Sequence, residues 1–470
     1  MLIYDNDPLL NRKIMFFKDG TLNLFSALVR RKDFVKPDLR KSIYVYGEEL
    51  TSFVLKLLPK DNKNLNKILS KYLNHKSKRQ FYNIKNQLNS WIDRKLFPLP
   101  FLRCLAYYKD SSNLVNTLIC KGEYFCDHLG KGKIKLPKTT KELKDSFYFY
   151  LAGCSLGDGC IDKSGKQWIF CDGGGKDELV YSKRFIVKIK DYISKKFSLK
   201  ISDSSVQFKR NCYILQIKNK SFCRFYNFFF GLPFGKKKHF KFPSLIIKLD
   251  DKQKIMERSF WRGLFDTDGS IDKKGLRITF SSNLNCVIDI CKERLNLIKI
   301  NCVVNKKGLQ KSGFGTHNCN CLYIPYDQFY HFSTKIGFAH PRKQKILVGK
   351  LKKGPKNSIF CGLRKNNEKI DEEILHIGKF VRPYFYKENS ILLFNRISNG
   401  SKLDDFEYEK LKNSFENIFD KKVKGTKFCR VSNKKICTFF DSNFIYQLPW
   451  EPLNNNETEI YLKEWNSVFN

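Results

Sequence analysis

Two aspartates stand in the same local pattern at two places in the chain. The segment FYLAGCSLGDGCI puts Asp158 in an Asp-Gly pair after an apolar stretch, and the segment FWRGLFDTDGSI does the same with Asp268. A single Asp-Gly pair is an ordinary helix-ending turn. Two in matching surroundings predict a pair of carboxylates with a common role. Carboxylates at close quarters repel one another unless a cation or a shared proton stabilises them, and hard oxygen ligands suit Mg²⁺.

The charge of the chain indicates the substrate on which such a metal would act. The 470 residues include 88 Lys and Arg against 46 Asp and Glu, a formal net charge of +42. This excess calls for a polyanionic partner, with nucleic acid as the first candidate and an anionic membrane surface as the second. We expect phosphodiester hydrolysis, in which metal ions bridge the carboxylates and the scissile phosphate and lower the pKa of the attacking water.

Apolar runs and cysteines indicate where the protein works. No apolar run reaches the ~18 residues of a membrane span, and the sequence predicts no secretory signal peptide. We therefore expect no membrane partner and a cytoplasmic, nucleoid-associated location. The 16 cysteines include no C-x-x-C pair, so we expect reduced thiols packed as small apolar residues.

An internal repeat supplies the elements that must position the two aspartates. The segments DGCIDKSG and DGSIDKKG, which begin at Asp158 and Asp268, match at six of eight positions. The patterns that follow also match in order, and they predict α-β-β-α-β-β-α twice between roughly residues 138 and 350. A T-x-x-E capping box at Thr139 and Glu142 begins the first helix, which we expect to run on through Leu151 and Cys154. In the first copy, the elements expected after Asp158 are a strand at 167–171, a helix at 180–197, strands at 205–208 and 212–217, an aromatic helix at 222–231 and a basic turn at 234–243. In the second copy, the elements expected after Asp268 are a strand at 276–280, a helix at 284–298, strands at 302–305 and 321–326, an aromatic helix at 326–337 and a basic turn at 338–347.

Small residues recur at fixed positions in the two opening helices. Gly153 and Gly157 lie four residues apart in the first helix, and Gly263 and Thr267 occupy the same positions in the second. Small residues four apart share one helix face and let two helices approach closely. The pattern predicts a tight two-helix seam.

The flanking regions carry weaker signals. We divide the chain into an unassigned segment at 1–60, a basic helical region at 61–135, repeats at 136–248 and 249–350, and a C-terminal appendage at 351–470. In the second region, Ser77 and Gln80 form a capping box before a helix with apolar residues at helical spacing. Three short helices with a basic middle one suit a helix-turn-helix module, and a plain helical connector fits as well. The appendage contains two expected strands, at 390–397 and 435–441, and an expected helix at 405–419.

These motifs resemble those of a monomeric, two-motif LAGLIDADG homing endonuclease of the DOD type. LAGCSLGDG and WRGLFDTDG match its two motifs, and LPFGKKKHFKFPSL is similar to the same region of archaeal members, many of them stand-alone. The resemblance covers about residues 136 to 350. It implies an α+β fold in which two pseudo-symmetric repeats form a saddle of two antiparallel sheets that tracks the DNA major groove.

The resemblance also implies roles for particular residues. The metal ions, Mg²⁺ or Mn²⁺, fall to Asp158 and Asp268 with Gly157 and Thr267 beside them, and the helix seam falls to Gly153, Gly157, Gly263 and Thr267. A lysine of each basic turn orders water near the scissile phosphates, which favours Lys237 over Lys238 in the first repeat and gives Lys343 in the second. One departure is Leu156, where the family often has a second acid, as Asp266 is in the second motif. Strand alternation gives the expected DNA-contacting residues Gln207, Lys209, Arg210, Gln216, Lys218, Arg277 and Thr279.

The sequence thus predicts a site-specific double-strand DNA endonuclease that spreads an intron or mobile element, acting as a monomer with internal pseudo-two-fold symmetry. An RNA maturase that binds intron RNA through the same basic saddle is one alternative. A cleavage-dead DNA-binding regulator is another, which the presence of both aspartates disfavours.

Overall fold

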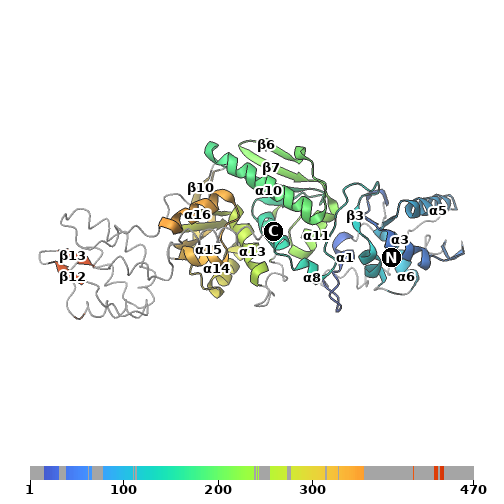
Figure 1. The fold of residues 1–470 in the computed structure, drawn as a ribbon, viewed down its shortest axis with the longest axis horizontal. Coiled ribbons are helices and arrows are strands. Elements are labelled where there is room, and N and C mark those ends of the chain that lie inside the picture. Colours follow the sequence, from blue (N-terminus) through green and yellow to red (C-terminus); the bar gives the residue numbers. More distant parts are fainter. Residues whose placement is uncertain are drawn as a thin grey trace. The chain divides into compact units, whose positions relative to one another are not determined.

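The protein has an α+β fold, which confirms the class expected from the sequence (Figure 1). The structure is a computed structural model, and it describes residues 15–30, 39–61, 63–65, 78–109, 111, 114–237, 240, 242, 254–271, 277–312, 315–325, 328–353, 406, 428–431 and 435–438. The chain divides into two compact units, Met1–Thr267 and Asp268–Val468, and each is described by itself. In the described ranges, no helix combines the length and the apolar character needed to cross a membrane.

The N-terminal part of the first unit is built around a small antiparallel sheet. Its strand order is β2-β1-β3, so the central strand comes from the segment before residue 60 and the outer strands come after it. A boundary at residue 60 therefore does not separate two folded parts. Strands lie among the helices that were expected at 61–135, and Ser77 falls outside the described residues. The elements, in chain order, are α1 (Leu24–Leu28), η2 (Leu39–Lys41), β1 (Tyr44–Tyr46), α3 (Glu48–Leu57), α5 (Lys78–Asp93), β2 (Leu96–Pro98), α6 (Leu99–Tyr108), α7 (Leu114–Lys121) and β3 (Tyr124–Cys126).

The first repeat follows in the same unit, with the expected order of elements. Its sheet is antiparallel, with the strand order β4-β5-β7-β6. The unit ends with the opening helix of the second repeat, α13 (Lys254–Thr267). The elements of the first repeat are α8 (Thr140–Leu143), α9 (Ser146–Leu156), β4 (Gly159–Ile161), β5 (Trp168–Gly173), η3 (Lys176–Glu178), α10 (Leu179–Phe197), η4 (Asp203–Ser205), β6 (Val206–Lys209), β7 (Cys212–Ile217) and α11 (Lys220–Phe230).

The helix expected to run on from Thr139 is in fact two helices. The Thr139 hydroxyl accepts a hydrogen bond from the Glu142 backbone N–H at 3.2 Å, so the predicted cap begins α8. The Asp145 carboxylate then accepts one from the Phe147 backbone N–H at 2.9 Å and begins α9. The single helix was a wrong expectation because apolar spacing alone does not reveal a second cap inside the run.

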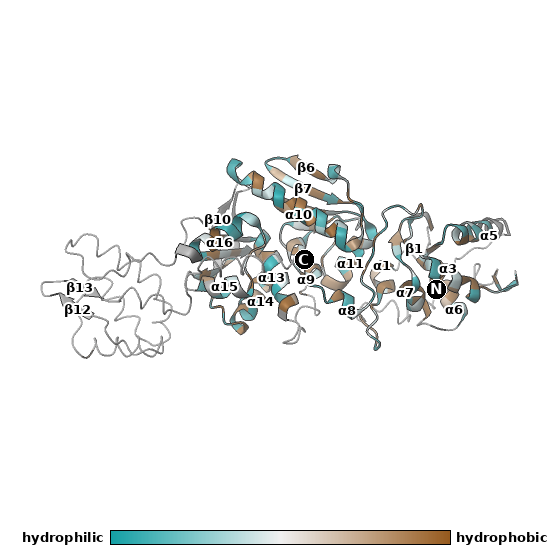
Figure 2. Cartoon of the chain, viewed as in Figure 1, coloured by the Kyte–Doolittle hydropathy of each residue, from teal (hydrophilic) through white to brown (hydrophobic). Residues whose placement is uncertain are grey.

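One face of the first sheet is covered by α10 and α11. Trp168, Phe170, Leu215 and Ile217 on that face are buried, and the Phe170 ring packs edge-on against Phe185 of α10 at 5.9 Å between centroids. Apolar and polar residues alternate along α10 at helical spacing, as the colours of Figure 2 show. The helix therefore buries one face on the sheet. The opposite face of the sheet, here called the open face, is described below.

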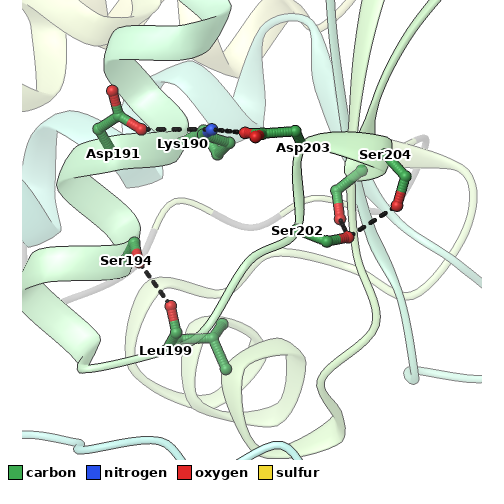
Figure 3. Close-up of polar contacts among 8 residues, drawn as sticks. Lys190, Asp191, Ser194, Leu199, Ser202, Asp203 and Ser204 are labelled. Atoms are coloured by element: carbon green, nitrogen blue, oxygen red, sulfur yellow. Dashed lines mark hydrogen bonds and ion pairs between the residues drawn. The ribbon is translucent and has the colours of Figure 1, made fainter.

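Polar contacts fix the connection from α10 to β6 (Figure 3). The Lys190 ammonium lies 2.5 Å from an Asp203 carboxylate oxygen and 3.5 Å from one of Asp191. The Ser194 hydroxyl donates to the Leu199 carbonyl at 2.7 Å, which closes the end of the helix. These contacts set where β6 begins, and with it the two expected DNA-contacting residues on that strand.

The second unit holds the rest of the second repeat. Its antiparallel sheet has the order β10-β11-β9-β8, which repeats the topology of the first sheet. The basic segment expected to be a turn is largely a helix, α16, whose first turn contains Lys343. In the appendage a hairpin of β12 and β13 is described, which overlaps the strand expected at 435–441; the strand at 390–397 and all but Phe406 of the helix at 405–419 fall outside the described residues. The elements are β8 (Gly269–Ile271), β9 (Arg277–Ser282), α14 (Asn285–Leu297), β10 (Val303–Ser312), β11 (Gly315–Pro325), α15 (Phe329–Lys335), α16 (Pro341–Lys353), β12 (Phe428–Val431) and β13 (Lys435–Thr438).

Candidate functional site

The opening helices α9 and α13 touch backbone to backbone at two glycines. A Cβ atom added to Gly153 would lie 2.0 Å from the Phe260 carbonyl oxygen, and one added to Gly263 would lie 2.1 Å from the Tyr150 carbonyl oxygen. The two contacts mirror each other, since Gly153 corresponds to Gly263 and Tyr150 to Phe260 in the repeat. The expected helix seam therefore exists at these two glycines. Both lie in the last turn or so of their helices, so the C-terminal ends of α9 and α13 come together.

The seam is symmetric in backbone and asymmetric in side chains. The Tyr150 hydroxyl donates a hydrogen bond to the Asp266 carboxylate across the seam at 2.7 Å, and both side chains are fully buried. The residues at the corresponding positions are Phe260 and Leu156, an apolar pair. Burial, followed by the neighbouring Asp266 carboxylate, raises the pKa of Tyr150 well above its usual value, so the phenol keeps its proton. The sequence analysis noted Asp266 but not Tyr150. The indication in the sequence was the hydroxyl of Tyr150, at a position where the second repeat has Phe260.

Asp158 follows the C-terminal end of α9 and is exposed to solvent. The Lys237 ammonium donates to the Leu156 carbonyl at 2.5 Å and also to the Gly157 carbonyl. These are the last carbonyls before Asp158, where the helix macrodipole is negative and a cation is stabilised. The lysine favoured for the first repeat is thus at the helix end beside the aspartate, and Lys238 falls outside the described residues.

Asp268 is the residue that follows α13, and it is partly buried. The Lys343 ammonium, on a side chain only 5% exposed, donates to the Gly269 carbonyl at 2.5 Å. The second lysine therefore also contacts a carbonyl next to its aspartate, but that carbonyl belongs to the residue after Asp268 rather than to the residues before it. Thr267 turns its hydroxyl back onto the Gly263 and Leu264 carbonyls, at 3.1 and 2.9 Å, and so closes its own helix.

The donors at these helix ends suit a hard divalent cation. Each aspartate supplies carboxylate oxygens next to backbone carbonyls, and Mg²⁺ prefers oxygen ligands, usually one or two carboxylates completed by water and substrate phosphate. In the part of the chain that the structure describes, no three His, Cys, Asp or Glu side chains gather into a site that protein alone could complete. The donor set thus fits a metal whose coordination includes water and a phosphate.

The expected DNA-contacting residues lie mostly on the open faces of the two sheets. In the first sheet Gln216 pairs with Ile169, Gln207 with Ile214, and Lys209 with Cys212. These directly paired residues share a face, opposite the one that α10 covers. Two of the expected residues lie at loops: Arg210 is in the β6–β7 turn with φ 52°, and exposed Lys218 follows β7. In the second unit Thr279 pairs with Tyr323, and the Arg277 guanidinium lies over the Tyr323 ring at 4.4 Å from its centroid.

A family model provides an independent comparison for the second repeat. Residues 256–337 match the LAGLIDADG-like domain, a segment that contains most of α13, Asp268 and the strands of the second sheet. Residues 256–337 are therefore similar to the LAGLIDADG-like domain, which confirms over this segment the LAGLIDADG resemblance seen in the motifs.

Several solved structures are similar to this chain. One, of mesophilic variants of the homing endonuclease I-DmoI, aligns at 14% identity and a TM-score of 0.32 and covers 44% of this chain and 99% of its own. A structure of I-DmoI in complex with DNA and Ca gives 14% identity, a TM-score of 0.31 and coverage of 44% and 99%. Full-length DUF199/WhiA from Thermatoga maritima gives 12% identity, a TM-score of 0.29 and coverage of 71% and 94%. No curated protein matches the chain.

Proposed function

We propose that this protein is a site-specific double-strand DNA endonuclease that hydrolyses phosphodiester bonds with a divalent metal ion, Mg²⁺ or Mn²⁺. The observation that carries the proposal is the repeated helix end: twice in the chain, an aspartate follows a seam helix and a lysine ammonium sits on a carbonyl within two residues of it. One such helix end would serve each DNA strand.

The roles follow from the chemistry of these groups. Asp158 and Asp268 would hold the metal ions, and Gly157 and Thr267 are the residues that precede them at the helix ends. A metal ion held there would polarise the scissile phosphate and lower the pKa of the attacking water. Lys237 and Lys343 would hold positive charge where negative charge grows on the phosphate in the transition state. The net charge of +42 attracts DNA and fits a long binding site.

The test is a selection of cleaved sites from a randomised duplex DNA library in the presence of Mg²⁺. We expect one preferred sequence, cut on both strands, with no cutting in EDTA. A chain that binds the library but cuts nothing would favour a regulator on the same fold. Selective binding of structured RNA over duplex DNA would favour a maturase. Either result would overturn the proposal.

A further inference from the structure

The open face of the first sheet is apolar at its centre. One row across the strands holds Cys160, Ile169 and Gln216, and the next row holds Cys171, Ile214 and Gln207. The isoleucines and cysteines are partly exposed, because they lie on the face that α10 does not cover. Burial, then the neighbouring Cys160 and Asp158, raises the pKa of the Cys171 thiol to about 11, so that thiol is uncharged at neutral pH. The middle of this face therefore presents methyl, methylene and neutral thiol groups.

The same positions in the second sheet are mostly polar. The register of its strands makes Ser270 the counterpart of Cys160, Thr279 the counterpart of Ile169, and Ser281 the counterpart of Cys171. The two exchanges of Cys for Ser keep nearly the same shape, and the exchange of Ile for Thr keeps the β-branch but shortens the side chain; each introduces a hydroxyl. The second open face can therefore donate and accept hydrogen bonds at points where the first cannot.

Basic residues border the apolar centre at both ends of the strands. At one end Lys209 and Arg210 are exposed near the β6–β7 turn, and at the other Lys218 is exposed after β7. Between Cys212 and Lys218 the strand advances by six residues, or about 20 Å at the usual rise. The B-DNA major groove is about 12 Å wide, with a phosphate backbone on either side. An apolar strip with cations at its ends thus complements the floor of that groove and its two phosphate walls.

We propose that the first repeat reads thymine C5-methyl groups through this apolar strip, so that the half-site it contacts is rich in A·T pairs, whereas the second repeat reads its half-site by hydrogen bonds. The inference rests on the proposed function, because it takes duplex DNA as the ligand of the open faces. Thymine alone among the bases carries a methyl group in the major groove. Opposite G·C pairs, the same apolar groups would leave base donors and acceptors without partners, which is unfavourable.

The experiment measures binding to a selected site in EDTA, so that no strand is cut. Thymidines are replaced by deoxyuridine one at a time, which removes only the C5-methyl group. We expect affinity to fall about fourfold for each buried methyl removed, at several positions of one half-site and at few or none of the other.

Exchanged side chains assign the responsive half-site to a repeat. In the double variant Ile169→Thr with Cys171→Ser, deoxyuridine should weaken binding at fewer positions of that half-site, because only Cys160 and Ile214 of the apolar strip remain. In the reverse variant, Thr279→Ile with Ser281→Cys, sensitivity to deoxyuridine should appear in the other half-site. Cys286→Ser, at an exposed position of α14, is the matched control for a thiol-to-hydroxyl change away from the sheets.

The outcomes separate this inference from the proposed function. A protein that cuts its selected site but responds equally to deoxyuridine in both halves, or keeps an undiminished response in the first double variant, overturns the thymine reading alone. A protein that selects no duplex DNA overturns both. Melting temperatures of the variants show whether a lost response comes instead from a lost fold.

Discussion

The two repeats share their backbone plan and differ in what they place on it. Both have four-stranded antiparallel sheets of the same topology, and both have a glycine where the seam helices touch. At the seam, however, the hydrogen-bonded pair Tyr150 and Asp266 corresponds to the apolar pair Phe260 and Leu156. On the open faces, cysteine and isoleucine in the first repeat correspond to serine and threonine in the second. The shared features are those that set the positions of the aspartates. These other positions carry different side chains in the two repeats. A single chain permits such differences, whereas the two identical subunits of a symmetric dimer do not.

The largest expected effect tests whether the two aspartates are equivalent. Asp158→Asn and Asp268→Asn each remove a carboxylate charge from one helix end, and each should lower the rate of double-strand cleavage by at least about 1,000-fold. DNA binding should stay within a few-fold of the wild-type value. Single-turnover cleavage with the two strands labelled separately would check this and show which strand each aspartate serves. Undiminished cutting by either variant would contradict the metal role.

The lysines should give a smaller effect that differs between the repeats. Lys237→Met and Lys343→Met should each slow cleavage by roughly 100-fold at unchanged DNA affinity. Lys343 is buried and bonded to the Gly269 carbonyl, so its removal should also lower the free energy of unfolding by about 1–3 kcal/mol. Lys237 is only partly buried, so Lys237→Met should lower the free energy of unfolding by less. Cleavage rates paired with urea titrations separate the two effects, and equal stability losses would show that the lysines sit in similar environments.

The seam glycines should behave alike. Gly153→Ala and Gly263→Ala each drive a methyl group into a backbone carbonyl about 2 Å away, and neither backbone can yield without moving a helix. We expect each to lower the free energy of unfolding by about 3 kcal/mol. Chemical denaturation of the full chain would measure it. Gly175→Ala is the matched control, since an added Cβ there meets nothing within 4 Å; a loss for the control as large as for the seam variants would rule out the close approach as the cause.

The smallest effect probes the side chains in which the seam is asymmetric. Tyr150→Phe leaves the buried Asp266 carboxylate without this hydrogen bond and should cost about 2 kcal/mol of unfolding free energy. The double variant Tyr150→Phe with Asp266→Leu copies the Phe260 and Leu156 pair and should recover most of that loss, because an apolar pair needs no hydrogen bond. A double-mutant cycle by thermal denaturation gives the coupling. Additive losses would mean that the hydrogen bond contributes little to the seam.

The sequence predicted the repeat well because its signals are local and occur twice. A strand pattern read in one copy could be compared with the other, so the element order, the seam glycines and the open-face positions of Gln207, Gln216 and Thr279 followed from spacing. The helix α1 was not predicted, because it lies outside the repeat and its sequence has no helical alternation of apolar and polar residues. All five of its residues are buried, so it has no polar face from which a helical period could be read. The break at Asp145 and the Tyr150 hydrogen bond depend on single side-chain contacts, which spacing does not report.

The burial of α1 has a consequence for the order in which the chain folds during synthesis. α1 packs against α11 of the first repeat, and the Arg224 guanidinium donates to the Leu28 carbonyl, 196 residues back along the chain. A nascent chain emerges N-terminus first at roughly 5–20 residues per second, so α1 waits on the order of 10–40 s for its partner to be made. Until then Phe25 and Leu28 have no α11 to cover them. The early product of translation is thus a candidate client for a chaperone that binds short apolar segments, even though the finished protein buries them completely.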